Sequence, residues 1–487
     1  MVAARLSTGV NLTDPIDEAI ARVPERIAFV VGDASISYAA LGEAIEHASA
    51  ALVDNGVAAG DRVALIDTAG TLAIATVLAC ARIGAAAAPM SARATSAEIA
   101  AMMKAAGCGV VGVAGAAASG RFSDATGTPP LGEEILWTSG YAASLRPTLR
   151  GEDVAVVLFT SGTTGVPKPV PLSHQVLGDR VRGFTAIDPS ATPTVSMVCV
   201  PFHHVAGLIG VLVGLAGGNT AVFQPRFDAG EWLALVERHR VQRAFLVPTM
   251  LQRIIGHPAF ARADLSSLQM ITYGAAPASA DLIGRAVNSF PSNVAFVQVF
   301  GQTETLGAVT VLGPEDHRAA RASSVGKAMA GVEVRIVDPM TGRDLPDGEV
   351  GEFWVRAPHT ATPGWVRSGD LVRRDTDGYL YVIGRLSDVI NRGGEKIDPS
   401  EVENALRSHE DVVDAAVCGI PDTELGEQVA AVIVARKLVE PEALQEWCRA
   451  RLGAHKIPTR FVFADELPLT ELGKVSRRGL RVLFDGS

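Results

Sequence analysis

The chain has 487 residues, of which 48% are hydrophobic and 20% charged, the balance of an ordinary globular protein with room for several domains. Its net charge of −10, with no block of like charge, argues against a nucleic-acid partner, which would need a basic face. The 49 glycines and 27 prolines follow no collagen-like period and indicate many tight turns.

Cysteine usage and the N-terminus favour a cytoplasmic protein. The segment Met1–Asp14 lacks the charged-then-apolar pattern of a signal peptide. The apolar stretch Val205–Gly218 is too short to span a membrane, so we expect a buried strand or helix there and no integral membrane association. The cysteines are odd in number and widely spaced, so we expect reduced structural thiols at Cys80, Cys108, Cys199, Cys418 and Cys448.

Helical and apolar segments alternate from the start of the chain. The pattern predicts a helix over Ala40–Asp54, a buried strand over Arg62–Asp67 and a helix over Thr71–Ile83 that Gly84 ends. The small-residue stretch Gly115–Pro130 is predicted to be a surface loop. This alternation is typical of an α/β domain with a mostly parallel sheet, and it continues through Asp153–Thr160, Ala221–Arg240 and Gln242–Leu246.

The last hundred or so residues form a second pattern of the same kind. Helices are predicted over Pro399–Ser408 and Pro441–Gly453, with a strand over Val412–Ile420 between them. A module of about a hundred residues is small but can fold around its own core. The fold class we predict is therefore α/β, with a large N-terminal part and a small C-terminal α/β domain.

A run of small and hydroxylated residues follows the apolar strand Val154–Phe159. Backbone N–H groups and hydroxyls in such a loop can close around phosphate oxygens, while Lys168 supplies positive charge. The loop is not the P-loop of other NTPases, because Pro169 stands where a magnesium-binding Ser or Thr should be. An ordinary glycine turn remains the alternative for this run by itself, which reads Thr160, Ser161, Gly162, Thr163, Thr164, Gly165, Val166, Pro167, Lys168.

This loop resembles the phosphate loop of the adenylate-forming superfamily, which comprises acyl-CoA synthetases, adenylation domains of peptide synthetases, and luciferases. Further segments similar to that family's motifs follow in the family's order over nearly the whole chain. They are Pro201–Gly207, Tyr273–Pro277, Phe300–Glu304, Trp365–Asp370, Gly384–Asp388, Gly393–Ile397, Pro399–Glu403 and Leu467–Lys474.

The resemblance implies a role for each matching residue. Lys474 is implied to be the catalytic lysine, acting with Glu304 as the Mg²⁺ ligand, Thr303 as a phosphate contact, and His204, whose register is ambiguous because His203 adjoins it and a core histidine stays open. The acyl pocket is implied to include His204, Ala206, Gly207, Tyr273, Gly274 and Leu306. The nucleotide is implied to contact the loop residues Thr160, Ser161, Gly162, Thr163, Thr164 and Lys168, together with Gly274, Ala275, Ala276, Pro277, Phe300, Gly301, Gln302, Asp370 and Arg385.

The chemistry of acid activation needs these residue types. A carboxylate and an ATP triphosphate repel each other, so fixed positive charge at Lys474 must offset that repulsion in a dry site. Glu304 is a hard oxygen ligand of the kind that Mg²⁺ takes beside phosphates. The resemblance implies an N-terminal domain over residues 1–386 and a mobile lid over 387–487, which rotates about the hinge Asp388 and lines a pantetheine tunnel with Gly393 and Gly394.

The expected activity is that of an acyl-CoA synthetase that uses ATP, Mg²⁺ and coenzyme A. The predicted pocket residues are mainly small or apolar, and none is a cation able to hold a second carboxylate, which favours a medium-chain or longer fatty acid, with an aryl acid as the alternative. A separate carrier protein as acceptor and a homodimer both stay open. Lys474, Glu304 and Asp370 are all present, which disfavours an inactive adenylate-binding protein. The segment between Arg356 and Trp365 is shorter than is usual in the family.

Overall fold

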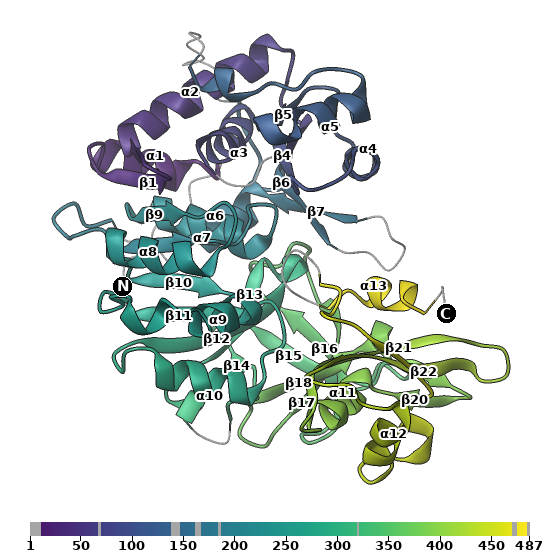
Figure 1. The fold of residues 1–487 in the computed structure, drawn as a ribbon. Coiled ribbons are helices and arrows are strands. Elements are labelled where there is room, and N and C mark those ends of the chain that lie inside the picture. Colours follow the sequence, from purple (N-terminus) through teal and green to yellow (C-terminus); the bar gives the residue numbers. More distant parts are fainter. Residues whose placement is uncertain are drawn as a thin grey trace. The chain divides into compact units, whose positions relative to one another are not determined.

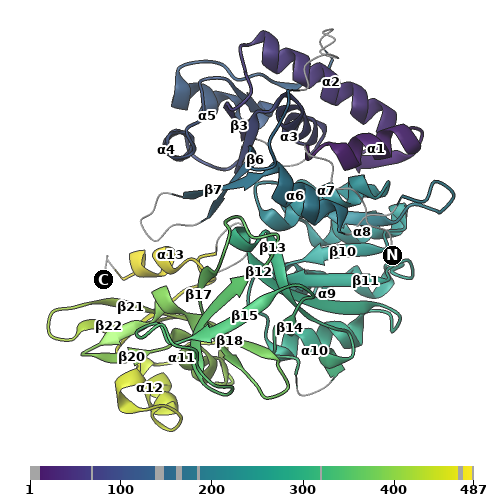
Figure 2. The same ribbon diagram turned by 180° about the vertical axis from the view of Figure 1, so that it is seen from behind.

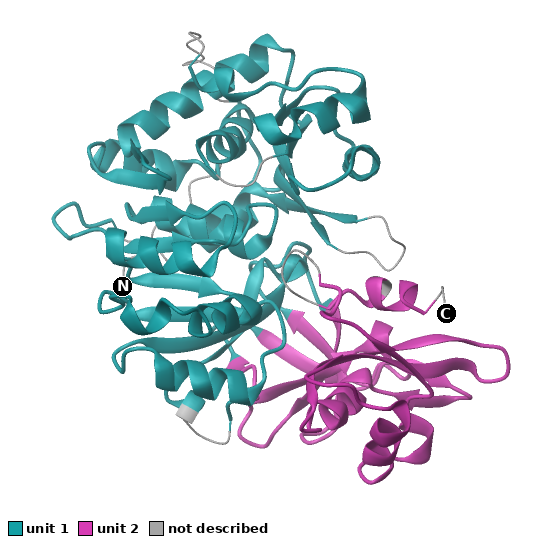
Figure 3. Cartoon of the chain, viewed as in Figure 1, with its two compact units in different colours: residues 1–322, 328–332, 356–366 teal, residues 323–327, 333–355, 367–487 magenta. Residues whose placement is uncertain are grey.

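The computed structural model describes residues 11–66, 70–137, 147–160, 167–183, 187–318, 321–469 and 475–484. These residues form two compact units (Figure 3). Unit 1 comprises residues 1–322, 328–332 and 356–366, and unit 2 comprises residues 323–327, 333–355 and 367–487. The chain thus crosses between the units several times before its C-terminal stretch. The expected domain boundary at 386/387 stays a prediction.

A five-stranded sheet occupies the N-terminal part of unit 1. Its strands lie in the order β5-β3-β4-β6-β7, with the pairs from β5 to β6 parallel and β6–β7 antiparallel. Figures 1 and 2 show this sheet from opposite sides. The strands are β3 (Arg62–Ile66), β4 (Ala86–Met90), β5 (Gly112–Ala114), β6 (Val154–Thr160) and β7 (Lys168–Ser173).

A nine-stranded sheet forms the rest of unit 1, in the order β14-β13-β12-β11-β10-β8-β9-β1-β2. Its central strands are parallel, whereas β1–β2 and β12–β13 pair antiparallel. The strands are β1 (Ile27–Val31), β2 (Ala34–Ser37), β8 (Val195–Val198), β9 (Thr220–Phe223), β10 (Arg243–Leu246), β11 (Met270–Gly274), β12 (Ala295–Gln302), β13 (Gly307–Leu312) and β14 (Lys327–Ala328).

Helices of unit 1 cover both sheets, and the largest apolar core is built from α1, α2, α3, α7 and the strands that they pack against. The α-helices are α1 (Asp14–Arg22), α2 (Tyr38–Asp54), α3 (Thr71–Ile83), α4 (Ser96–Ala106), α5 (Ala116–Thr126), α6 (His174–Arg182), α7 (Val205–Ala216), α8 (Ala229–His239), α9 (Pro248–Ile255) and α10 (Ala280–Ser289). Short 3₁₀ helices are η1 (Glu133–Leu136), η2 (Phe260–Arg262), η3 (Thr303–Thr305) and η4 (Asp316–Arg318).

Unit 2 contains two sheets. A four-stranded sheet has the order β15-β16-β17-β18, and a five-stranded sheet joins β20-β19-β22-β21 with β23 beside β22. The strands are β15 (Glu333–Val337), β16 (Val350–Arg356), β17 (Val366–Arg374), β18 (Leu380–Arg385), β19 (Ile390–Arg392), β20 (Glu395–Ile397), β21 (Val412–Asp422), β22 (Gly426–Ala435) and β23 (Arg460–Phe463). The helices are η5 (Leu386–Asp388), α11 (Pro399–Arg407), α12 (Pro441–Arg449), η6 (Ala454–Lys456) and α13 (Arg477–Val482).

The predicted α/β class is confirmed, and most predicted elements appear within a few residues of their expected ends. Helix α3 spans the predicted Thr71–Ile83, and Gly84 ends it with φ +78°. A side chain at Gly84 would also lie 2.9 Å from Leu149 and Pro147, so both backbone angle and packing require glycine there. The apolar stretch Val205–Gly218 contains helix α7, and no helix among the described residues is long and apolar enough to cross a membrane.

Two predictions are wrong, one about a loop and one about the end of a helix. The stretch Gly115–Pro130 is not a loop, because Ala116–Thr126 forms α5 and buries Ala118 and Phe122 one turn apart. Its many small residues concealed that apolar spacing. The helix predicted over Pro441–Gly453 ends earlier, at Arg449, and a 3₁₀ turn follows it.

Phe122 gives a test of this packing. Its side chain is fully buried, and its ring lies where a side chain at Gly112 would be. We expect Phe122→Ala to lower the free energy of unfolding by about 3–5 kcal/mol, because it removes apolar contacts and leaves a cavity. The nearby exposed Val110→Ala should change it by no more than about 0.5 kcal/mol. Urea titration of both variants measures the difference, and equal small effects would contradict the packing of α5.

Candidate adenylate-forming site

The two ends of the predicted phosphate loop lie opposite each other. Thr160 at the end of β6 pairs with Lys168 at the start of β7, while Ser161, Gly162, Thr163 and Thr164 lie outside the described residues. An antiparallel strand follows the loop, so no helix N-terminus is placed directly after it. Lys168 is exposed, so a phosphate bound at this loop can reach its positive charge.

Pro169 follows the lysine of this loop without disturbing the sheet. It belongs to β7, the edge strand of its sheet, and it lies opposite Phe159 of β6. A proline without an N–H donor is tolerated on an edge strand, because no further strand needs that hydrogen bond. Pro169 therefore fits the local structure.

The predicted adenine turn follows β11. Its first residue, Ala275, has φ +65°, a left-handed angle that only a sharp turn imposes on a non-glycine residue. The preceding Gly274 lies against β12, where a Cβ atom would come within 2.2 Å of the Val299 carbonyl oxygen. The close strand contact thus requires glycine, and the turn carries the chain away through Ala276 and Pro277.

Tyr273 has a structural role that the sequence did not indicate. Its side chain is fully buried, and its hydroxyl lies 2.9 Å from Nε2 of His317 and 3.3 Å from Oε1 of Gln298. Burial raises the pKa of Tyr273, and burial lowers the pKa of His317. Both groups are therefore neutral hydrogen-bonding partners at neutral pH. That Tyr273 also lines an acyl pocket stays a prediction.

The turn from Gln302 to Gly307 carries Thr303 and Glu304, and it is closely held. The Thr305 hydroxyl donates to the Gly307 carbonyl at 2.7 Å and accepts from the Gln302 amide at 3.0 Å. A side chain at Gly301 would come within 1.9 Å of the Gly307 carbonyl oxygen, so strands β12 and β13 can approach only because Gly301 has none. Leu306 lies in this turn at φ +51° and is fully buried. Phe300 belongs to β12, the strand before the turn.

The shortened segment after Arg356 packs on this same turn. The Ala361 amide donates to the Glu304 carbonyl at 2.9 Å, and the Thr360 hydroxyl donates to the carbonyls of Ala357 and Thr362. The segment therefore braces the backbone that carries Glu304.

A second contact joins the segment after Arg356 to Ala308, which follows the turn Gln302–Gly307. The Ala308 carbonyl accepts from Arg180 at 3.1 Å, and His359 also hydrogen-bonds to Ala308. Burial, together with the charge of Arg180, lowers the pKa of His359 to about 4. Neither Arg180 nor His359 belongs to a motif quoted from the sequence, and no periodicity pointed to them, because their meeting depends on the tertiary fold.

The His204 segment begins α7. His204 is the residue before the helix, and its ring centroid lies 4.2 Å from that of His203. A Cβ atom at Gly207 would lie 2.3 Å from the Pro201 carbonyl oxygen, so the close packing there requires glycine. An apolar cavity of about 30 Å³ adjoins Ala206 and Gly207 and includes Phe245 in its wall.

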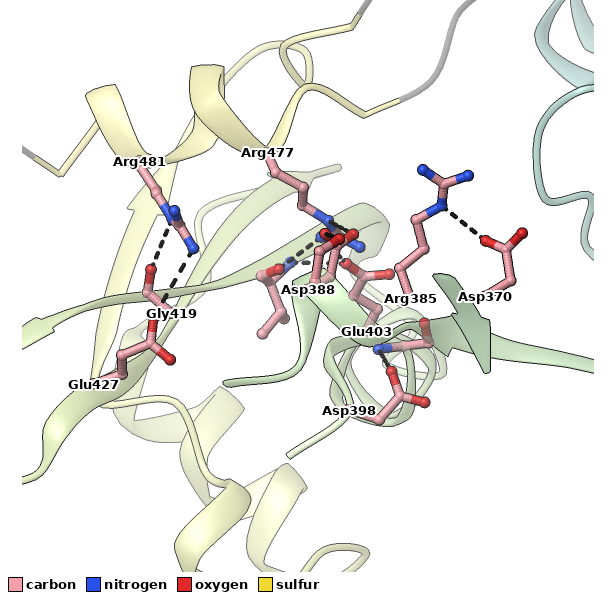
Figure 4. A network of polar contacts seen from close by, with 12 residues as sticks. Asp370, Arg385, Asp388, Asp398, Glu403, Gly419, Glu427, Arg477 and Arg481 are labelled. Carbon is pink, nitrogen blue, oxygen red and sulfur yellow. Dashed lines mark hydrogen bonds and ion pairs between the residues drawn. The ribbon is translucent and has the colours of Figure 1, made fainter. Parts of the chain in front are cut away.

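In unit 2, Asp370 and Arg385 form a pair across two adjacent strands (Figure 4). Asp370 on β17 lies opposite Arg385 on β18, and Arg385 Nε donates to Asp370 Oδ1 at 2.8 Å. The Asp370 side chain is 6% exposed and that of Arg385 is 49% exposed. Ser368 Oγ accepts from the Asp370 amide at 3.0 Å, which also holds the backbone of the aspartate. The sequence resemblance named both members of this pair.

The predicted hinge and tunnel residues also belong to unit 2. Asp388 ends η5, and its carboxylate lies 3.4 Å from Nε of Arg477. Gly393 and Gly394 have φ +61° and +91° and form the two-residue turn between β19 and β20. No atom lies within 4 Å of a Cβ placed at Gly394, so this side of the turn is open within the described structure.

The remaining catalytic candidates are Lys474 and Glu304. Lys474 lies outside the described residues. Among the residues that are described, no group of three or more His, Cys, Asp or Glu side chains is arranged to hold a metal. Glu304, half-buried on its held turn, fits the way Mg²⁺ binds, since this ion commonly takes one or two protein carboxylates and completes its shell with phosphates and water.

Comparison with known proteins gives the family. Residues 16–364 match the model of the AMP-binding enzymes, and residues 401–474 match the model of the AMP-binding enzyme C-terminal domain. A feruloyl-CoA synthase of an Amycolatopsis species is 34% identical, covering 95% of this chain and 96% of the relative. An indoleacetate–CoA ligase of Aromatoleum aromaticum is 33% identical over 97% and 98% of the two chains.

Two further comparisons agree. A medium/long-chain-fatty-acid–CoA ligase of Mycobacterium tuberculosis is 33% identical over 70% of this chain and 63% of the relative. The solved structure of an o-succinylbenzoate–CoA synthetase of Bacillus subtilis, in complex with its acyl-adenylate intermediate, has a TM-score of 0.84 and 26% identity, covering 98% of this chain and 99% of that one. The chain therefore belongs to the AMP-binding enzymes, the adenylate-forming superfamily that its motifs resemble, and it is an AMP-forming acid–thiol ligase.

Proposed function

We propose that this protein activates a hydrophobic monocarboxylic acid as an acyl-AMP and transfers the acyl group to coenzyme A. The observation that carries the proposal is the held turn Gln302–Gly307, which presents Thr303 and Glu304 from a backbone fixed by Thr305 and Ala361. Electrostatic catalysis depends on groups that are held in place before the reaction begins. Support for coenzyme A as acceptor comes from the three CoA ligases and synthases named above.

In the first half-reaction the acid carboxylate attacks the α-phosphorus of ATP, and pyrophosphate leaves. Lys474 offsets the repulsion between the carboxylate and the phosphate, and Lys168 and Thr160 bind phosphate oxygens at the loop. Asp370 accepts hydrogen bonds from the ribose hydroxyls, and Arg385 keeps its carboxylate oriented. Glu304 would hold Mg²⁺, which would neutralise phosphate charge when bound.

In the second half-reaction the thiolate of coenzyme A attacks the acyl carbon, and AMP leaves with the oxygen that came from the acid. The lid must first turn about Asp388 so that Lys474 moves away and the Gly393–Gly394 turn borders the pantetheine path. These steps require no group beyond those already named.

The acid itself is the finer part of the proposal. The candidate pocket residues are mainly small or apolar, which favours a medium-chain or longer aliphatic acid. An aryl acid is the second candidate, and the two full-length relatives with aromatic acids in their names favour it. The two candidate acids differ in shape, so they would fit differently beside Ala206 and Phe245.

A panel of acids tests the function and the substrate together. Pyrophosphate release should require ATP, Mg²⁺ and a hydrophobic acid, and a thioester should form only when coenzyme A is also present. We expect C8–C16 aliphatic acids to give the highest kcat/KM values, with ferulate and phenylacetate lower. Higher values for the aryl acids would select the second candidate. Acyl-AMP formation without any use of coenzyme A would instead favour a carrier protein as acceptor.

Lys474 is tested by separating the half-reactions. Lys474→Ala should slow acyl-AMP formation by about 10²–10³-fold, because one electrostatic contact to the transition state is lost. Thioester formation from supplied acyl-AMP should change far less. The matched control is Lys437→Ala, since Lys437 is exposed and only pairs with Asp411 at the surface. Equal losses in both half-reactions would show that the assigned role of Lys474 is wrong.

Gly394 is tested with a pair of variants, because its φ of +91° strains any side chain. Gly394→Ala adds that strain with little bulk, whereas Gly394→Leu adds both. We expect acyl-AMP formation to be the same in the two variants and transfer to coenzyme A to fall much further in Gly394→Leu. Transfer rates that are equal in both variants would argue against a pantetheine path beside this turn.

A further inference from the structure

Strand β21 is the longest described strand, and it lies at the edge of its sheet. It has 11 residues and pairs with β22 on one side, while no strand among the described residues pairs with its other side. Its central residues, 415–420, include no charged residue and no proline. An uncovered edge of this length and composition would be a template on which another strand could pair.

Charged side chains of α11 cover the first part of this edge. Alternate residues of an antiparallel edge strand turn their N–H and C=O groups away from the sheet, and in β21 these are Ala415, Val417 and Gly419. Arg407 donates to the Ala415 carbonyl at 2.6 Å. The Val417 amide donates to Glu403 Oε1 at 3.0 Å. The outward backbone groups thus bond to side chains instead of to a strand.

Helix α13 covers the next part of the same edge (Figure 4). Arg477 Nη1 donates to the Val417 carbonyl at 2.6 Å, and Arg481 Nε donates to the Gly419 carbonyl at 3.1 Å. Arg477 also donates to Glu403 Oε1 at 2.6 Å, so side chains of the two helices meet beside Val417. We call the set the edge clasp, which comprises Glu403, Arg407, Arg477 and Arg481.

The spacing of the edge clasp matches the spacing of the strand. Its members are four residues apart on each helix, Glu403 and Arg407 on α11, and Arg477 and Arg481 on α13. Four residues of an α-helix advance by about 6 Å, and two residues of a strand advance by about 6.6 Å. Each helix therefore places two charged side chains in register with backbone groups that face outward.

Apolar side chains attach both helices to the sheet. Leu406 of α11 packs in a buried cluster with Val417, whereas Leu480 and Phe484 pack in a second buried cluster with Cys418. Because successive strand residues point to opposite faces, the two helices lie on opposite faces of the sheet. Burial of these apolar groups holds the helices in place. The charged side chains that reach the edge thus have a role beyond attachment.

We propose that the edge clasp closes β21 to strand pairing, and that the partner it excludes is β21 of a second copy of this chain. Two identical apolar edges can pair antiparallel about a twofold axis, because such an interface is self-complementary. The edge of β21 is therefore excluded as the interface of the homodimer that the sequence leaves open. This inference does not depend on the proposed activity.

Removal of the two outer arginines tests the proposal. The side chains of Arg407 and Arg481 are 36% and 53% exposed, whereas those of Arg477 and Glu403 are 28% and 8% exposed. The double variant Arg407→Ala/Arg481→Ala uncovers two outward carbonyls and leaves the more buried pair in place. The matched control, Arg285→Ala/Arg449→Ala, removes the same charge from two exposed ion pairs within helices.

Sedimentation velocity over a concentration series of the full chain measures self-association. We expect Arg407→Ala/Arg481→Ala to self-associate at least about tenfold more tightly than the control, since each uncovered carbonyl can accept a hydrogen bond from a second copy. The unsubstituted protein should behave like the control. Equal self-association of the folded edge variant and the control would overturn the proposal.

A peptide probe shows whether the new contact lies at β21. A fluorescent peptide with the sequence of residues 412–422 should bind the edge variant at least about tenfold more tightly than the control, because it can add as a strand to the opened edge. A scrambled peptide of the same composition should bind neither protein. Equal binding of the two peptides would overturn the proposal, since it would indicate exposed apolar surface in general.

Arg481→Ala alone replaces the double variant if circular dichroism shows that the latter does not fold. Its side chain is 53% exposed and lies outside the more buried pair, so its removal disturbs the helix least. We expect self-association about threefold tighter than that of Arg449→Ala, in keeping with one uncovered carbonyl. A folded Arg481→Ala variant that self-associates like Arg449→Ala would contradict the closure of the edge by the clasp.

Discussion

Repulsion between two anions is the constraint on which the proposed chemistry depends. An acid carboxylate and an ATP phosphate must come within bonding distance, where like charges repel strongly unless positive charge is fixed nearby in a site with little water. Lys168 and the turn that carries Glu304 belong to unit 1, whereas Asp370, Arg385 and Lys474 belong to unit 2.

The same constraint explains why the candidate residues are supported so closely. A charge that is free to move would follow the reacting groups instead of stabilising the transition state. Glu304 stands on a turn held by Thr305 and by the short segment that includes Ala361. Asp370 is held by Arg385 and Ser368. Glycine at positions 274 and 301 lets neighbouring backbone approach to distances that no side chain would allow.

The sequence predicted the fold class, most element positions and the identity of the family, because motif spacing and hydrophobic periodicity are local properties. It also named the Asp370–Arg385 pair and the glycine turn at 393–394. It missed α5, whose small residues dilute the apolar signal of Ala118 and Phe122. It also missed Arg180 and His359, because the contacts of these side chains join positions far apart in the chain. Such contacts follow only from the assembled structure.

The path of one oxygen atom tests the account most directly. If the acid is activated as an acyl-AMP, an acid labelled with ¹⁸O in its carboxylate should pass one labelled oxygen to AMP when the thioester forms. Mass spectrometry of the AMP and pyrophosphate from a single incubation with ATP, Mg²⁺, labelled acid and coenzyme A measures this transfer. The account predicts one ¹⁸O in AMP and none in pyrophosphate. Unlabelled AMP, or label in inorganic phosphate with ADP as the nucleotide product, would contradict it.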